Sequence, residues 1–165
     1  MDLTKTERLI LINQYRMLSV ICPDEKKDSD IAIDILANGY KHNYDSLVDF
    51  LSDDMPEEIS KEVIDILQMF RSLNNSYHEL NDKSGIDKGN VIFQGFDGNE
   101  ETEHYSYADF FINKYDRYSE FSKVAINSHC NMLYMYRPML KAWSKYERYQ
   151  SLNKEQIIEI INAYK

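Results

Sequence analysis

The chain has 165 residues and a formal net charge of −9, from 19 Lys and Arg against 28 Asp and Glu side chains. The length fits one compact domain over residues 1–165, and a hydrophobic content of 43% argues against a disordered chain. The low count of chain breakers, 5 Gly and 3 Pro, favours long helices over a sandwich or a barrel, and the acidic balance argues against a general nucleic-acid binder.

The N-terminal third carries signals for two helices and a shorter third one. Thr4 and Glu7 have the spacing of a capping box, which predicts a helix that runs to about Val20. The apolar residues of that helix are spread around much of its circumference. This pattern is typical of a helix buried in the core or in a subunit interface. A second helix is predicted over about residues 25–38, and a short one around residues 44–51.

The middle of the chain contains the longest predicted helix and then an irregular stretch. Pro56 and the carboxylates around it form a strong start signal, and apolar residues keep helical spacing from there to about Lys83. Residues 85–99 hold four of the five glycines and are predicted to be an irregular connector. Residues 91–93 could form a short strand, but no partner strand is evident, so an extended connector pinned by its two phenylalanines is the better interpretation.

The C-terminal part is predicted to contain three more helices. An aromatic stripe marks the first, over residues 100–121, and a less regular segment, 122–131, follows it. The second helix, 132–149, has apolar and basic residues on opposite sides, and the third, 153–164, has Asn153 as its candidate cap. The whole pattern predicts an all-α fold, a single-domain helical bundle of about six helices.

The predicted helix at 132–149 carries the sharpest local signal. At 100° per residue its basic side chains fall within about an 80° arc, opposite an apolar half that holds the only Trp. Such a face could bind nucleic acid, an acidic partner or an anionic ligand, or it could be the solvated side of a core helix, which is the commoner case. The candidate residues for anion or partner binding are Arg137, Lys141, Lys145 and Arg148.

Charge is unevenly distributed along the chain. Residues 1–113 carry 10 basic and 23 acidic side chains, a net charge of −13, whereas residues 114–149 carry 7 basic and 3 acidic ones, a net charge of +4. The two parts can neutralise each other within a chain or across a homo-oligomer. If the basic face binds a partner, the acidic surface of the chain's own N-terminal part is therefore the first candidate.

The sequence contains no complete pattern for catalysis, for a cofactor or for a metal. Glu101 and His104 form a Glu-x-x-His unit, but di-iron bundles need two such units and two further glutamates. Cys130 adjoins His129, yet neighbours in sequence need not face each other, and catalytic pairs usually come from distant positions. We therefore expect no catalytic residue, no cofactor and no metal ligand.

Cysteine content and the N-terminal residues bear on the location of the protein. The two cysteines lack a CxxC spacing, as expected for reduced thiols in the cytoplasm. Polar residues interrupt the apolar run near the N-terminus, so it does not resemble a signal peptide, and no stretch approaches the ~18 apolar residues of a membrane span. The sequence thus predicts a soluble cytoplasmic protein with no membrane partner.

Composition also favours contact between proteins. Tyr, present 13 times, and Met, present 7 times, both suit contact surfaces, and we expect a homo-oligomer. The leading hypothesis is an oligomeric interaction or regulatory protein without catalysis, with a second protein as a possible partner. The alternatives are a nucleic-acid-associated regulator acting through the basic face of the 132–149 helix, and an enzyme whose site is not readable from the sequence, around residues 85–104.

Short runs of residues along almost the whole chain form a recognisable set. They are Arg8–Leu18, Ile64–Leu67 with Met69, Phe93–Asp97, Arg117–Tyr118 with Phe121, Tyr136–Trp143, and Glu155 with Ile160–Ala163. In this order they resemble the bacterial YfbU family, whereas segments 22–34 and 122–131 match it less well. The resemblance implies a predominantly helical protein in a bacterial cytoplasm, and it carries over no catalytic or binding residue.

Overall fold

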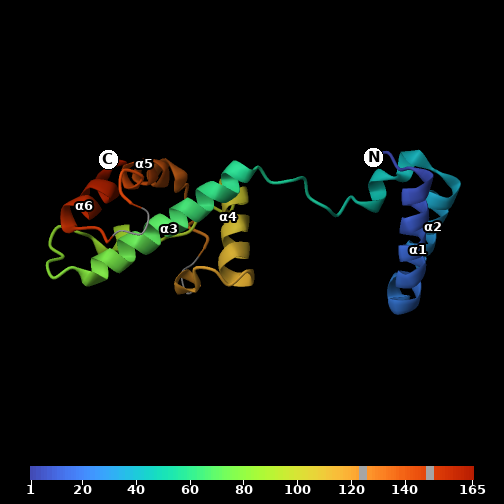
Figure 1. The fold of residues 1–165 in the computed structure, drawn as a ribbon, viewed down its shortest axis with the longest axis horizontal. Coiled ribbons are helices and arrows are strands. Elements are labelled where there is room, and N and C mark those ends of the chain that lie inside the picture. Colours follow the sequence, from blue (N-terminus) through green and yellow to red (C-terminus); the bar gives the residue numbers. More distant parts are fainter. Residues whose placement is uncertain (123–125, 148–150) are drawn as a thin grey trace. The chain divides into compact units, whose positions relative to one another are not determined.

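The computed structural model describes residues 1–122, 126–147 and 151–165. It divides into two compact units, Met1–Asp54 and Met55–Lys165, whose helices are shown in Figure 1. Six α-helices and one π-helix lie in these described residues, and no β-strand does, which confirms the expected all-α fold of about six helices. The expectation of one domain over residues 1–165 stays a prediction.

The first unit is built on two helices that pack against each other, α1 (Lys5–Ile21) and α2 (Lys26–Asn38) (Figure 1). The predicted capping box is confirmed: Glu7 N–H donates to Thr4 Oγ1 over 3.2 Å, and Thr4 N–H donates to Glu7 Oε2 over 2.7 Å. Gly39 ends α2 in the left-handed conformation at φ +71°, which costs a glycine little.

The predicted short helix at 44–51 is wrong. In place of an α-helix, this range contains one 3₁₀ turn, Asp45–Leu47, which follows another at Lys41–Asn43. Ser46 Oγ donates to the Asn43 carbonyl over 2.8 Å, so a side chain competes for backbone groups that an α-helix would use.

The second unit is organised around α3 (Glu57–Glu79), which contacts α4, α5 and α6. Its buried side supplies much of the core, including Val63, Ile66, Leu67, Phe70 and Leu73. The predicted end near Lys83 is four residues too late, because Leu80 is already extended. Lys83 Nζ turns back to the Leu80 carbonyl over 2.5 Å and satisfies a backbone acceptor at the helix end.

The connector at 85–99 is confirmed as irregular. It contains one 3₁₀ turn, Lys88–Val91, and then runs extended with Phe93 and Phe96 fully buried in the core. An isolated bridge joins Phe96 to the 126–128 segment: its N–H donates to the Ile126 carbonyl over 2.8 Å. The two aromatic side chains therefore anchor the connector, as the sequence predicts.

The predicted helix at 100–121 is wrong in its second half. The chain forms α4 (Thr102–Asp109), continues as a π-helix (Phe110–Lys114) and then leaves helical geometry. Asp116 and Tyr118 take positive φ values of 53° and 55°, which end any regular helix. Partners from α3 hold the Tyr118 ring in this turn, because its hydroxyl donates to Gln68 Oε1 over 3.0 Å.

The last two helices are α5 (Leu133–Trp143) and α6 (Lys154–Asn162). The cap predicted at Asn153 is confirmed, with its side chain accepting from the Gln156 N–H over 2.9 Å. The predicted helix at 132–149 is too long, since α5 ends at Trp143, where the Ser144 hydroxyl donates to the Lys141 carbonyl over 2.8 Å. The helical spacing that predicted one basic face therefore ends before Lys145, and Arg148 lies outside the described residues.

Candidate functional site

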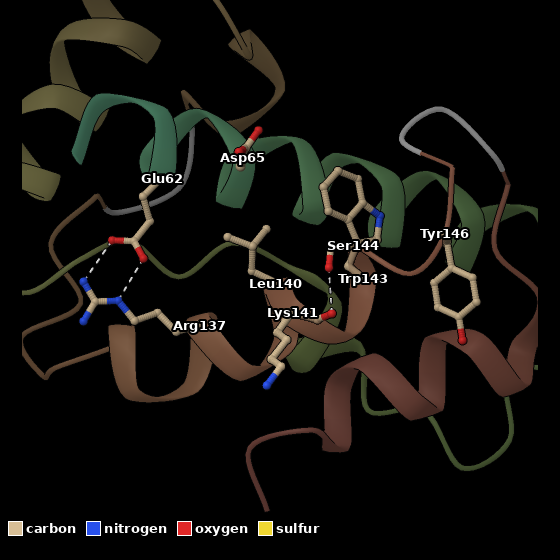
Figure 2. A pocket seen from close by; sticks show the side chains of 8 residues that line it. All are labelled: Glu62, Asp65, Arg137, Leu140, Lys141, Trp143, Ser144 and Tyr146. Carbon is tan, nitrogen blue, oxygen red and sulfur yellow. Dashed lines mark hydrogen bonds and ion pairs between the residues drawn. The ribbon is translucent and has the colours of Figure 1, made fainter. Parts of the chain in front are cut away.

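A hollow of about 510 Å³ lies along α3 and α5 in the second unit and includes two of the predicted basic residues (Figure 2). Arg137 and Lys141 are on α5 and line it, Lys145 follows the end of that helix, and Arg148 lies outside the described residues. The full lining is Glu62, Asp65, Arg137, Leu140, Lys141, Trp143, Ser144 and Tyr146.

One end of the hollow is occupied by an ion pair between α3 and α5 (Figure 2). Arg137 donates from Nε to Glu62 Oε1 over 2.8 Å and from a terminal nitrogen to Glu62 Oε2 over 3.0 Å. His104 Nε2, on a side chain that is 8% exposed, lies 2.8 Å from the same Oε2. The Arg137 hydrogen bonds, aided by His104, hold the pKa of Glu62 below its usual range against the opposing effect of burial. The ionised carboxylate thus offsets the charge of Arg137.

Acidification should lower the free energy of unfolding of the wild type more than that of a Glu62→Gln variant. The folded-state pKa of Glu62 lies below its unfolded value of about 4.3, so its stabilising effect is present above that pH. The effect is lost as the pH falls through the lowered folded-state pKa. Urea unfolding at about pH 7 and about pH 3.5 measures the difference.

The exposed Glu58 provides the matched control for this experiment. Glu58→Gln removes one carboxylate from the same helix, and its response to acid should follow the wild type. If Glu62→Gln loses as much stability between the two pH values as the wild type does, the ion pair is not what makes the fold sensitive to acid.

Lys145 is also paired, with a residue of α6. Its Nζ lies 2.5 Å from Glu159 Oε1, and the Tyr146 hydroxyl donates to Glu159 Oε2 over 2.7 Å. The Lys145 hydrogen bond is the main reason that the pKa of Glu159 is lowered. Lys141 Nζ has neither an ion pair nor a hydrogen bond within the part of the chain that the structure describes. Two of the three described basic residues are therefore offset by the chain's own carboxylates.

The rest of the lining is suited to binding more than to reaction. Trp143 is 5% exposed, and its indole N–H has no hydrogen-bond partner among the described residues, so the wall holds an unused donor. The Ser144 hydroxyl donates to a backbone carbonyl and not to a base, which leaves it without the activation that a nucleophile needs. With Asp65 and Glu62 balancing Lys141 and Arg137, the lining as a whole has no strong excess of either charge.

The structure gives Glu101 and His104 separate roles. Glu101 is 4% exposed, and its Oε1 accepts the backbone N–H groups of Met132 and Leu133 over 2.8 and 2.6 Å. Its Oε2 accepts the Asp97 N–H over 2.9 Å, whereas His104 contacts Glu62. Over residues 1–122, 126–147 and 151–165, no three or more His, Cys, Asp or Glu side chains gather in a way that could hold a metal ion.

A second hollow, of about 550 Å³, follows the π-helix and was not predicted from the sequence. The Arg71 guanidinium lies 3.8 Å from the centre of the Tyr118 ring and pairs with Glu120. Arg117 lies 5.7 Å from the Tyr115 ring at the same hollow. The residues come from α3 and from a turn about 50 positions later, so no local pattern could have joined them.

Comparison with known proteins supports the resemblance seen in the sequence. The family model of the YfbU domain matches residues 1–163. UPF0304 protein MJECS11 of Methanocaldococcus jannaschii is 36% identical over 169 aligned residues, which cover 98% of this chain and 99% of that protein. No helix in the described residues is both long and apolar enough to cross a membrane. The chain, whose described elements are helices and which the family model matches over residues 1–163, belongs to the YfbU family.

Proposed function

We propose that this protein is a helical interaction protein that works as a homo-oligomer and does not itself catalyse a reaction. The observation that supports it is the surface of α1: none of the side chains of this 17-residue helix is buried. Ile10, Met17 and Val20 are 53%, 57% and 78% exposed. Exposed apolar side chains in such number on one helix are normally covered by other protein, so α1 is suited to association.

The basic residues on α5 and just after it support the alternative functions less well than the surface of α1 supports association. Arg137 and Lys145 already have carboxylate partners, and an ion pair must be broken before either can bind a phosphate. Cys22 and Cys130 are both free thiols, which fits a reducing compartment, and we place the protein in the cytoplasm. An oligomeric interaction protein therefore accounts for more of the described surface than a nucleic-acid regulator does.

Light scattering coupled to size-exclusion chromatography tests this proposal on the full chain. At micromolar concentration we expect a mass of two or more chains of 19.6 kDa each. This mass should fall reversibly on dilution. Reversible dissociation separates a specific oligomer from an aggregate. A mass of one chain at every concentration would contradict the proposal.

A further inference from the structure

Helix α1 has two different apolar faces. One face packs on α2 and consists of half-buried residues that fall within about a 100° arc. Arg8 belongs to this face, and its guanidinium donates to the Leu36 carbonyl at the end of α2 over 3.0 Å. The remaining members of this face are Leu11, Ile12, Tyr15 and Ser19.

The opposite face of α1 is exposed and carries a regular stripe. Its members, which we call the far-side stripe, recur at spacings of four, three, four and three residues and span about an 80° arc. This is the heptad spacing with which one α-helix packs along another. The far-side stripe consists of Thr6, Ile10, Asn13, Met17 and Val20.

We infer that the far-side stripe is the surface through which α1 pairs with α1 of a second copy of this chain. This inference rests on the proposed function and adds the contact that would form the oligomer. The stripe extends over about 21 Å of helix, and exposed Leu9 and Ile21 border it with further apolar surface. In the same unit, Phe50 and Leu51 are 83% and 62% exposed and offer additional apolar area.

Charge favours a second copy as the occupant of the stripe. The whole chain has a net charge of −9, so two copies repel each other unless they meet at a surface free of carboxylates. None of the five residues in the far-side stripe is charged. Within α1, three cations, Lys5, Arg8 and Arg16, outnumber the single acid Glu7. Two α1 helices can therefore approach each other with little like-charge repulsion.

Shape also favours a second copy. A heptad stripe fits another heptad stripe, and the large hydrophobic side chains exposed among the described residues of Met55–Lys165 are Phe110, Tyr115 and Tyr134. These three aromatic residues do not form a helical stripe of that spacing. Most homo-oligomers are two-fold symmetric and place the same patch of both copies in contact. The far-side stripe meets this requirement, because it can pack against itself.

Asn13 lies in the middle of the stripe and provides a sensitive test. A single Asn in a helix–helix seam fixes the alignment of the helices at a cost in stability. Replacing Asn13 by Leu should therefore tighten the oligomer, with a dissociation constant at least about tenfold lower. Replacing Met17 by Glu puts a carboxylate in the seam of both copies and should raise that constant at least about tenfold.

Sedimentation equilibrium of full-length wild type, Asn13→Leu and Met17→Glu measures these shifts. Ile31→Glu on α2 is the matched control: this side chain is 50% exposed, is close in size to Met17 and lies outside the stripe, so its dissociation constant should equal that of the wild type. Circular dichroism should show equal helical content in all four proteins, because the far-side stripe is exposed within the unit.

Three outcomes would overturn the inference. A wild-type oligomer that Met17→Glu leaves unchanged would reject the stripe as the contact while leaving the proposed function intact. A monomeric wild type would reject both the stripe as a contact and the proposed function. If Met17→Glu then lowered the melting temperature of this monomer, the stripe would be covered within a single chain. Binding of the monomer to anionic lipid vesicles through the same residues would assign the stripe to a membrane surface instead.

Discussion

Replacing Glu101 by alanine should lower the free energy of unfolding by about 3–5 kcal/mol, one of the largest effects expected from a single substitution in this protein. The buried Glu101 carboxylate accepts three backbone N–H groups, those of Asp97, Met132 and Leu133. Alanine would leave these donors without a partner in the interior, at roughly 1–3 kcal/mol for each, partly relieved by water.

The side chain of Glu101 reaches the N-terminus of α5, and this contact increases the expected loss of stability. The N-cap residue Met132 has no side-chain acceptor, so the carboxylate of Glu101 serves as the cap from a distance of 31 residues in the chain. Its negative charge also interacts favourably with the positive end of the helix dipole. Glu101→Ala therefore removes the cap of α5 and the link between α5 and the connector in one step.

Urea unfolding monitored by circular dichroism measures this loss. Glu103→Ala is the matched control, because Glu103 is exposed in the first turn of α4, two residues after Glu101, and its removal should change the stability by less than about 0.5 kcal/mol. Glu101→Gln keeps one acceptor oxygen and should fall between the two. A loss below about 1 kcal/mol for Glu101→Ala would show that water replaces the carboxylate without cost.

The features that the sequence predicted correctly are those determined within a few residues. The predicted capping box of Thr4 and Glu7 and the predicted cap at Asn153 each act within three residues, and the structure forms both. The predicted end of the second helix near residue 38 is likewise local, because Gly39 there takes the left-handed conformation at little cost. Such signals do not depend on the rest of the fold, so they predict the starts of α1 and α6 and the end of α2.

Two of the features that the sequence missed depend on partners that lie far apart in the chain. Arg137 and Glu62 are 75 residues apart, and their ion pair removes a charge that the periodicity of α5 had presented as available. Tyr118 is held by Gln68, 50 residues earlier, in a turn that ends the helical region predicted for 100–121. A count of charges or a helical wheel cannot reveal such pairs, because each pair is created by the fold itself.

Replacing Phe93 by alanine should destabilise the second unit by about 3–5 kcal/mol. Phe93 is fully buried, and its ring centre lies 5.8 Å from that of Phe70, 5.4 Å from Phe96, 5.7 Å from Phe121 and 6.0 Å from Tyr136. Alanine would remove all of these ring contacts and leave a cavity that a close-packed core cannot fully close.

The effect should be greatest in the connector at 85–99, which has no helix or sheet of its own to hold it. Next to Phe93, the Gln94 N–H donates to the Tyr136 hydroxyl over 3.1 Å, and this hydroxyl donates to the Gly95 carbonyl over the same distance. Loss of the Phe93 ring frees the backbone to move away from Tyr136. Hydrogen exchange at the Gln94 amide should therefore speed up more than exchange in α6.

Phe110→Ala is the control, since Phe110 is 46% exposed and its removal should cost no more than about 1 kcal/mol. Phe93→Leu should recover most of the stability, because it restores much of the lost volume. If Phe93→Ala matched Phe110→Ala both in unfolding free energy and in Gln94 exchange, the aromatic cluster would not be what holds the connector. If a single buried ring holds the connector, Phe93→Ala should lose the most stability and Phe110→Ala less. The stability loss of Phe93→Leu should lie between these two.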